Sequence, residues 1–254
     1  MPMMRRWWWT PACCLLLSAS STAFAQANLQ LWGNVTLDWV KSDRLTYEFD
    51  IEPKVLVYAP DDEPAWRNLD LTPNVEYAAK GWLDLVAEAT AGYTKQDDEV
   101  NTFELTPRVG VRFHFLSRAV PTVGLREQVP KRRVVVRDLV RVESRNFWYT
   151  DEGNGTSSSV RFRNRVEFLV PLNKVKVSED GARYLLADWE WYVPLGEPAE
   201  RFASKQRIRT GLGYRRSFVW RFEALYMWTR SRDTTAEGFS TDDNTIDIRV
   251  KRLF

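Results

Sequence analysis

Residues 160–170 read VRFRNRVEFLV, and apolar and charged side chains alternate along this stretch. One face of an extended chain carries the apolar residues Val160, Phe162, Val166, Phe168 and Val170. The other face carries the charged residues Arg161, Arg163, Arg165 and Glu167. Successive side chains of a β-strand point to opposite faces, so this period of two predicts a strand with one apolar and one charged face.

The same alternation recurs in residues 29–39, 45–57, 102–115 and 218–228. No long stretch shows the spacing of three and four residues that is typical of an amphipathic helix. The sequence therefore predicts an all-β protein.

Two all-β architectures fit an alternating pattern: a soluble sandwich with its apolar face inward, and a membrane barrel with its apolar face toward lipid. Soluble strands have about 5 to 6 residues, whereas these alternations run for about 10 to 14, which suits the 9 to 11 residues that a tilted strand needs to cross a bilayer. Aromatic residues such as Trp39, Tyr93, Trp148 and Tyr214 gather near the ends of the segments, where rings lie at headgroup depth. We therefore expect a transmembrane β-barrel in an antiparallel meander.

The expected number of strands is about 12, within a range of 10 to 12. Eleven segments alternate clearly, and single-chain bacterial barrels normally have an even number of strands. Weak alternation of Val123, Leu125 and Val129 predicts a twelfth strand within residues 121–129.

Three prolines recur in similar surroundings, at Pro53, Pro73 and Pro107. Proline has no backbone N–H to donate to a neighbouring strand, so we expect each to mark a strand end or a bulge.

The first 25 residues have the pattern of a cleaved secretory signal peptide. Arg5 and Arg6 precede an apolar run, and small residues end at Ala25. The run is shorter than the roughly 18 to 20 apolar residues of a membrane-spanning helix, which argues against a retained anchor. We expect cleavage between Ala25 and Gln26, which leaves residues 26–254 as one barrel domain. Cys13 and Cys14 would be removed, so no disulfide is expected.

The C-terminal segment alternates again and ends on an aromatic residue, through Ile246, Ile248, Val250 and Phe254. It resembles the terminal strand by which outer-membrane barrels are delivered to the barrel-assembly machinery, although Arg252 departs from that pattern.

The whole mature chain resembles a family of bacterial outer-membrane barrels known as domain of unknown function 2490. The resemblance is carried by the signal peptide, the strand at 160–170, the segment at 207–214 and the terminal Phe254. The resemblance implies a barrel fold and an outer-membrane location, in contact with outer-membrane lipid. It implies no catalytic residue and no cofactor.

Charge is divided unevenly along the chain. Residues 26–116 contain 8 Lys and Arg against 16 Asp and Glu, whereas residues 117–254 contain 26 against 18. On the inward face, the early acidic residues are Asp38, Glu48, Asp50, Glu52, Asp70, Glu76, Asp84, Glu88 and Glu104. The later basic residues are Arg133, Arg137, Arg141, Arg145, Arg161, Arg163, Arg165, Arg207, Arg209, Arg221 and Arg249. Because consecutive strands are neighbours in a meander, an acidic wall should face a basic wall.

Such a lumen is either a narrow aqueous channel or a closed interior filled by ion pairs, since charges at this density must be paired or wet. The first alternative predicts a small porin-like channel for small anionic solutes, and the second a structural envelope barrel. We expect a monomer in either case. A formal charge of +2 does not suggest a nucleic-acid partner.

An enzymatic alternative rests on His114, the single histidine of the chain. His114 lies on the polar face of its strand, two residues from Arg112, so we expect a lumen histidine hydrogen-bonded among charged neighbours. If it instead lies at the lipid boundary with Ser117, it could serve an outer-membrane lipid-modifying acyl hydrolase. One histidine and no cysteine in the mature chain predict no metal centre built from those residues.

Overall fold

A computed structural model of the protein describes residues 28–59, 65–97, 101–115, 134–150, 155–196, 204–232 and 241–254. These residues form strands β1 (Asn28–Val40), β2 (Leu45–Tyr58), β3 (Trp66–Lys80), β4 (Leu83–Gln96), β5 (Thr102–His114), β6 (Val135–Tyr149), β7 (Thr156–Pro171), β8 (Ala182–Pro194), β9 (Ser204–Arg215), β10 (Trp220–Arg232) and β11 (Thr241–Leu253). Within the described ranges, no helix is long and apolar enough to span a membrane. The expected signal peptide lies outside the described residues.

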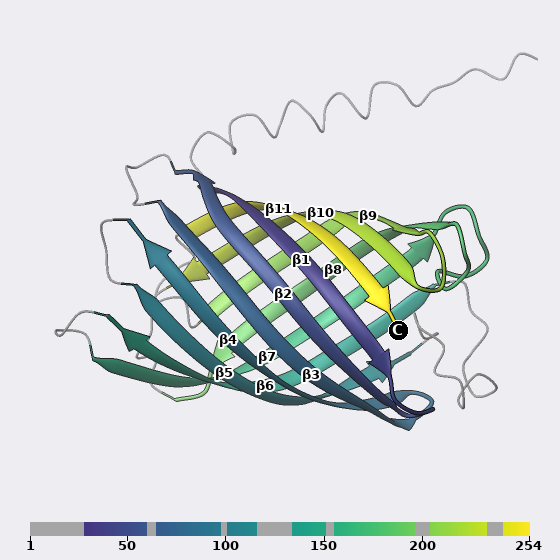
Figure 1. Ribbon diagram of the computed structural model, residues 1–254, viewed down its shortest axis with the longest axis horizontal. Helices are drawn as coiled ribbons and strands as arrows, with labels where there is room; N and C mark the ends of the chain where they lie inside the picture. Colours follow the sequence, from purple (N-terminus) through teal and green to yellow (C-terminus); the bar gives the residue numbers. More distant parts are fainter. Residues whose placement is uncertain are drawn as a thin grey trace, which may run out of the picture.

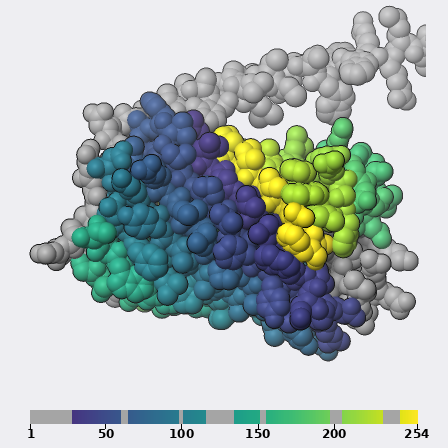
Figure 2. Space-filling model, in the orientation of Figure 1, coloured from purple at the N-terminus to yellow at the C-terminus, as the bar shows by residue number. Residues whose placement is uncertain are grey.

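The strands close into a barrel in which each strand pairs with its neighbours in sequence, and β11 returns to β1 (Figure 1). All the sequential pairs are antiparallel, whereas β1 and β11 are parallel. Figure 2 shows these two strands side by side, in purple and yellow. The expectation of an all-β closed barrel is confirmed, with one parallel seam in place of an entirely antiparallel arrangement.

The twelfth strand is not part of this barrel. Its expected residues, 121–129, lie outside the described ranges, but β5 pairs directly with β6 from Thr102 opposite Tyr149 to His114 opposite Arg137. No strand can lie between two strands that share a ladder. Since a meander reverses direction at every strand, a barrel closed by eleven strands must join its first and last strands in parallel.

Alternation gives each strand an apolar outer face and a polar inner face. On the outside, Val109 is 64% exposed and Leu212 is 58% exposed. On the inside, Glu143 and Glu190 are fully buried. Polar and charged residues outnumber hydrophobic ones among the buried residues of the described ranges, the reverse of a soluble core.

One apolar cluster does lie inside, toward the end of the barrel that holds the C-terminus. Its members are Val135, Leu169, Val177, Tyr184, Leu186 and Leu225. Two inward glycines on β9 make room for it, because a Cβ at Gly213 would overlap the Tyr184 ring and one at Gly211 would press on Leu225.

The three prolines lie inside strands, and the register is the same on either side of each, so the expectation that they mark strand ends or bulges is wrong. Pro53 pairs with Leu69 and Pro73 with Phe49, on the β2–β3 side, and Pro107 pairs with Ala89. On the other side of each strand, the register omits the proline and resumes one or two residues further on. Each proline thus interrupts one ladder locally, because it lacks the N–H that the ladder needs, while the other ladder continues.

The C-terminal residue is attached across the seam. The Phe254 N–H donates to the Asp38 carbonyl over 2.8 Å, and the Phe254 ring stacks on Trp39 at 5.4 Å between centroids. Ile246 and Ile248 point outward, at 40% and 45% exposed.

Candidate functional site in the lumen

The interior of the barrel contains a cavity of about 390 Å³, lined mainly by polar and charged side chains from every strand. This arrangement follows from the alternation along each strand, because the residues of the expected walls lie on the polar face of their strands and that face points into the barrel.

The expected acidic wall lies on β2 to β5. Cavity-lining members are Glu48, Asp50, Glu52, Asp70, Glu76, Glu88 and Glu104, joined by Asp38 of β1. Asp84 is fully buried behind this surface.

The expected basic wall lies mostly on β6, β7, β9 and β10. Its cavity-lining members are Arg137, Arg141, Arg145, Arg161, Arg163, Arg165, Arg207, Arg209 and Arg221, with Arg249 on β11. Arg133 lies outside the described residues.

Positive charge predominates on the cavity surface. Among the described residues, 15 Lys and Arg but only 11 Asp and Glu line it. The difference arises because Asp84, Glu143, Asp188 and Glu190 are buried behind the lining, where they compensate arginines without facing the cavity.

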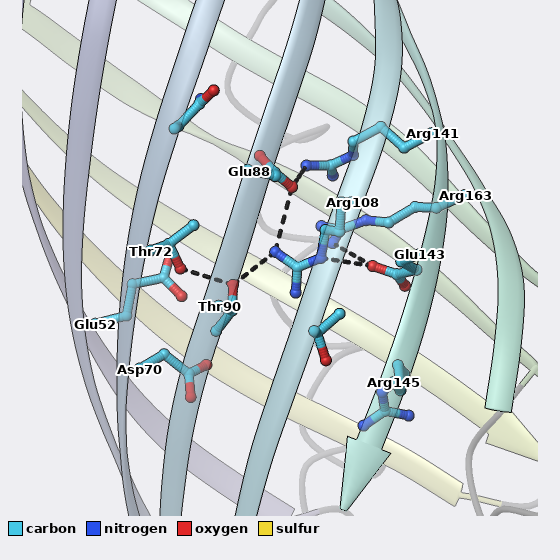
Figure 3. Close-up of polar contacts among 12 residues, drawn as sticks. Glu52, Asp70, Thr72, Glu88, Thr90, Arg108, Arg141, Glu143, Arg145 and Arg163 are labelled. Atoms are coloured by element: carbon cyan, nitrogen blue, oxygen red, sulfur yellow. Dashed lines mark hydrogen bonds and ion pairs between the residues drawn. The ribbon is translucent and has the colours of Figure 1, made fainter. Parts of the chain in front are cut away.

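Arg108 connects the two walls at the centre of the lumen (Figure 3). Its Nε lies 2.7 Å from a Glu143 carboxylate oxygen, and its Nη1 lies 3.2 Å from Glu88 and 2.8 Å from the Thr90 hydroxyl. Arg141 also binds Glu88. Arg108 of β5 thus links Glu88 and Thr90 of β4 to Glu143 of β6.

Two buried glutamates hold most of the arginines of the basic wall. Glu143 binds Arg108 and Arg161 and lies 3.6 Å from Arg163. Glu190 contacts the guanidinium groups of Arg141, Arg163, Arg207 and Arg209 at 2.6 to 3.6 Å. Removing such a carboxylate would leave several charges uncompensated in a poorly hydrated place.

Some donors of the wall keep no protein partner. Arg165 lines the cavity, and no carboxylate of the described residues lies within 4 Å of it. The Nη1 atom of Arg161 also has no hydrogen-bond partner, but it is buried away from the cavity surface. The Arg165 guanidinium is thus the donor group available to an anion in the cavity.

The aromatic residues in the lumen were not anticipated from the sequence. Trp32 lies between the cationic groups of Lys54 and Arg207, at 4.5 and 5.2 Å from its ring centroid. Tyr192 has the guanidinium groups of Arg161 and Arg163 at 4.6 and 4.7 Å. Both residues alternate in step with the inward polar residues of their strands, and this pattern could have predicted that they face the lumen. Cation–π attraction accounts for their position beside cationic groups.

His114 lies in the lumen and not at the lipid face. It is 8% exposed, and its Nε2 is 2.6 Å from the Asp84 carboxylate on the neighbouring strand. This position agrees with the polar face that His114 shares with Arg112 and Arg108, and it does not provide the lipid-facing histidine that the enzymatic alternative requires. Ser117 lies outside the described residues.

Comparison with known proteins gives a fold and a family. LpxR from Salmonella typhimurium is similar in structure, with a TM-score of 0.51 and 11% sequence identity over 83% of each chain. At this identity the likeness concerns the fold alone. No curated protein matches the sequence. The model of a family described as protein of unknown function (DUF2490) matches residues 29–239, and the chain belongs to that family, as its sequence pattern predicted.

Proposed function

We propose that this protein is an outer-membrane β-barrel whose lumen is a narrow pore that favours small anions. The strands are 12 to 16 residues long, enough to cross a bilayer when tilted. Their outer faces are apolar, and exposed aromatic residues lie near both ends, including Trp39 and Trp82 at one end and Tyr93 and Trp148 at the other. This distribution suits a bilayer with two interfaces.

The lengths of the connections favour an orientation. At the end that holds Phe254, residues 41–44, 81–82 and 216–219 form links of two to four residues, whereas residues 115–134 and 172–181 form two longer links. At the opposite end every link has five residues or more. The tight turns of outer-membrane barrels lie on the periplasmic side. All three links of fewer than five residues lie at the C-terminal end, so we infer that this end faces the periplasm.

The observation that carries the pore function is the excess of positive charge on the cavity surface. Guanidinium groups are charged at any working pH, so these arginines set the potential that a solute meets. Arg165 lines the cavity and provides guanidinium donors that no carboxylate of the described residues binds. The cavity size suits a small solute, because small-molecule sites are typically about 300–1,000 Å³.

Reversal potentials in a salt gradient, measured with the purified barrel in planar bilayers, test the proposal. The unmodified barrel should prefer chloride over potassium. Arg165→Gln should reduce that preference without disturbing an ion pair, since Arg165 has no carboxylate within 4 Å among the described residues. Arg44→Gln, which removes the same charge in an exposed turn, should leave it unchanged.

Replacing Arg161, Arg163 and Arg165 together by alanine should shift selectivity further toward cations. A barrel without conductance, or one that prefers cations in its unmodified form, would refute the pore proposal and favour a structural role for the filled lumen.

A further inference from the structure

A compact group of three possible metal ligands lies in the lumen near the C-terminal end. Glu76, Asp84 and His114 come from the consecutive strands β3, β4 and β5. One carboxylate oxygen of each acid and one ring nitrogen of His114 all lie within 4.8 Å of one another. The sequence offers no hint of the group, because its members are separated by 8 and 30 residues and meet only through strand pairing.

Strand pairing fixes these positions. Asp84 lies opposite Ala78 on β3 and opposite Arg112 on β5, so Glu76 and His114 are its diagonal neighbours on either side. The His114 N–H donates to the Trp82 carbonyl over 2.8 Å, which fastens the end of β5 to the start of β4. The three side chains are therefore carried by rigid strands and not by loops.

The group is closed at the back and open toward the cavity. The Asp84 side chain is fully buried and the His114 side chain is 6% exposed. Glu76 and His114 both line the cavity, and the Glu76 side chain is 23% exposed. An ion dissolved in the lumen could therefore reach the group.

Acidic side chains gather around the group. The carboxylates of Asp38, Glu48 and Glu76 line this part of the lumen, and Asp84 is buried behind them. Lys251 lies 3.0 Å from Asp38 and 2.5 Å from Glu48, and Arg112 binds Glu76. Arg137, across from His114, is already paired with Glu167 at 2.5 Å.

We propose that Glu76, Asp84 and His114 bind one divalent transition-metal ion. A ligand set of one imidazole nitrogen and two carboxylate oxygens suits zinc or manganese, whereas calcium and magnesium prefer oxygen ligands alone. The metal takes the place of the direct contact between His114 and Asp84, and Arg112 orients the Glu76 carboxylate from behind. A bound ion ties three strands together at the C-terminal end of the lumen. The inference is independent of the pore function.

Manganese binding to the full mature barrel in detergent micelles, after treatment with a chelator, tests the site. The signal of free Mn²⁺ in electron paramagnetic resonance should show one bound ion per barrel. One equivalent of Zn²⁺ should displace it, and the same amount of Ca²⁺ should not. Asp84→Asn and His114→Gln should each weaken binding at least tenfold.

Glu52→Gln is the matched control, because Glu52 belongs to the same acidic wall but not to the group. It should leave binding unchanged. Heat-modifiable migration in gels verifies that each variant is folded, and Glu76→Gln replaces any variant that is not. No stoichiometric binding to the unmodified barrel would overturn the proposal, as would equal weakening by Glu52→Gln, which indicates diffuse attraction to an acidic surface. Full binding by folded His114→Gln would also overturn it.

Discussion

At the scale of single residues, the lumen is organised by a few buried carboxylates that each serve several arginines. Glu190 is fully buried and contacts guanidinium groups from β6, β7 and β9. Tyr192 donates its hydroxyl proton to the same carboxylate over 2.8 Å. Such a network keeps arginine side chains in place around a cavity, where they would otherwise repel one another.

Replacing Glu190 should therefore be costly. In Glu190→Gln the arginines lose their shared counter-charge while remaining buried, and the free energy of unfolding should fall by about 3–5 kcal/mol. Urea unfolding in micelles, followed by tryptophan fluorescence, measures the change. Glu52→Gln should cost less than about 1 kcal/mol, because the Glu52 side chain is 32% exposed and its partner Lys54 keeps Asp70. Equal losses for the two variants would contradict this account of Glu190.

The sequence predicts that these charged residues face the lumen, but it does not predict which of them form ion pairs with one another. Arg141 and Glu190 are 49 residues apart and meet because β6 and β8 both flank β7. Which arginine remains without a carboxylate depends on distances across the lumen, and no alternation pattern contains those distances.

At the scale of strands, the alternation pattern predicts where the strands lie and which face of each is apolar. How the barrel closes depends on pairing between segments that are distant in the sequence. The stretch 160–170 forms most of β7, with its arginines inward. The expected twelfth strand came from the even strand numbers common among known barrels, which are not a physical requirement. An odd number needs only a parallel ladder, and β1 and β11 pair in register from Asn28 opposite Asp243 to Asp38 opposite Leu253.

The end of that seam should depend on Phe254. Its ring stacks on Trp39 and its N–H binds the Asp38 carbonyl, so Phe254→Ala removes the ring contact between the first strand and the chain end. We expect a smaller heat-modifiable fraction in the outer membrane and faster unfolding in urea. Phe218→Ala is a suitable control, because Phe218 is 40% exposed in a turn near the same end of the barrel. If both variants fold equally well, the terminal aromatic residue has no special part in closing the barrel.

At the scale of the whole molecule, eleven strands place the start of β1 and the end of β11 at opposite ends of the barrel. With the C-terminal end toward the periplasm, the start of β1 faces outward. An epitope tag inserted after Gln26 should bind antibody on intact cells, whereas a tag after Phe254 should bind only after the outer membrane is permeabilised. Both tags accessible from the same side would contradict the odd-stranded closure.

Spin-label accessibility along β7 distinguishes a barrel with lipid outside and charge inside from a soluble sandwich. The mature chain is expected to lack cysteine, so single cysteines at positions 160–168 can each be labelled and the barrel reconstituted into vesicles. Oxygen, which dissolves in lipid, should relax labels at 160, 162, 166 and 168 more than labels at 161, 163, 165 and 167, with a period of two. The opposite pattern, in which a water-soluble nickel chelate reaches the charged positions freely and oxygen does not favour the apolar ones, would indicate a soluble sandwich and contradict the account.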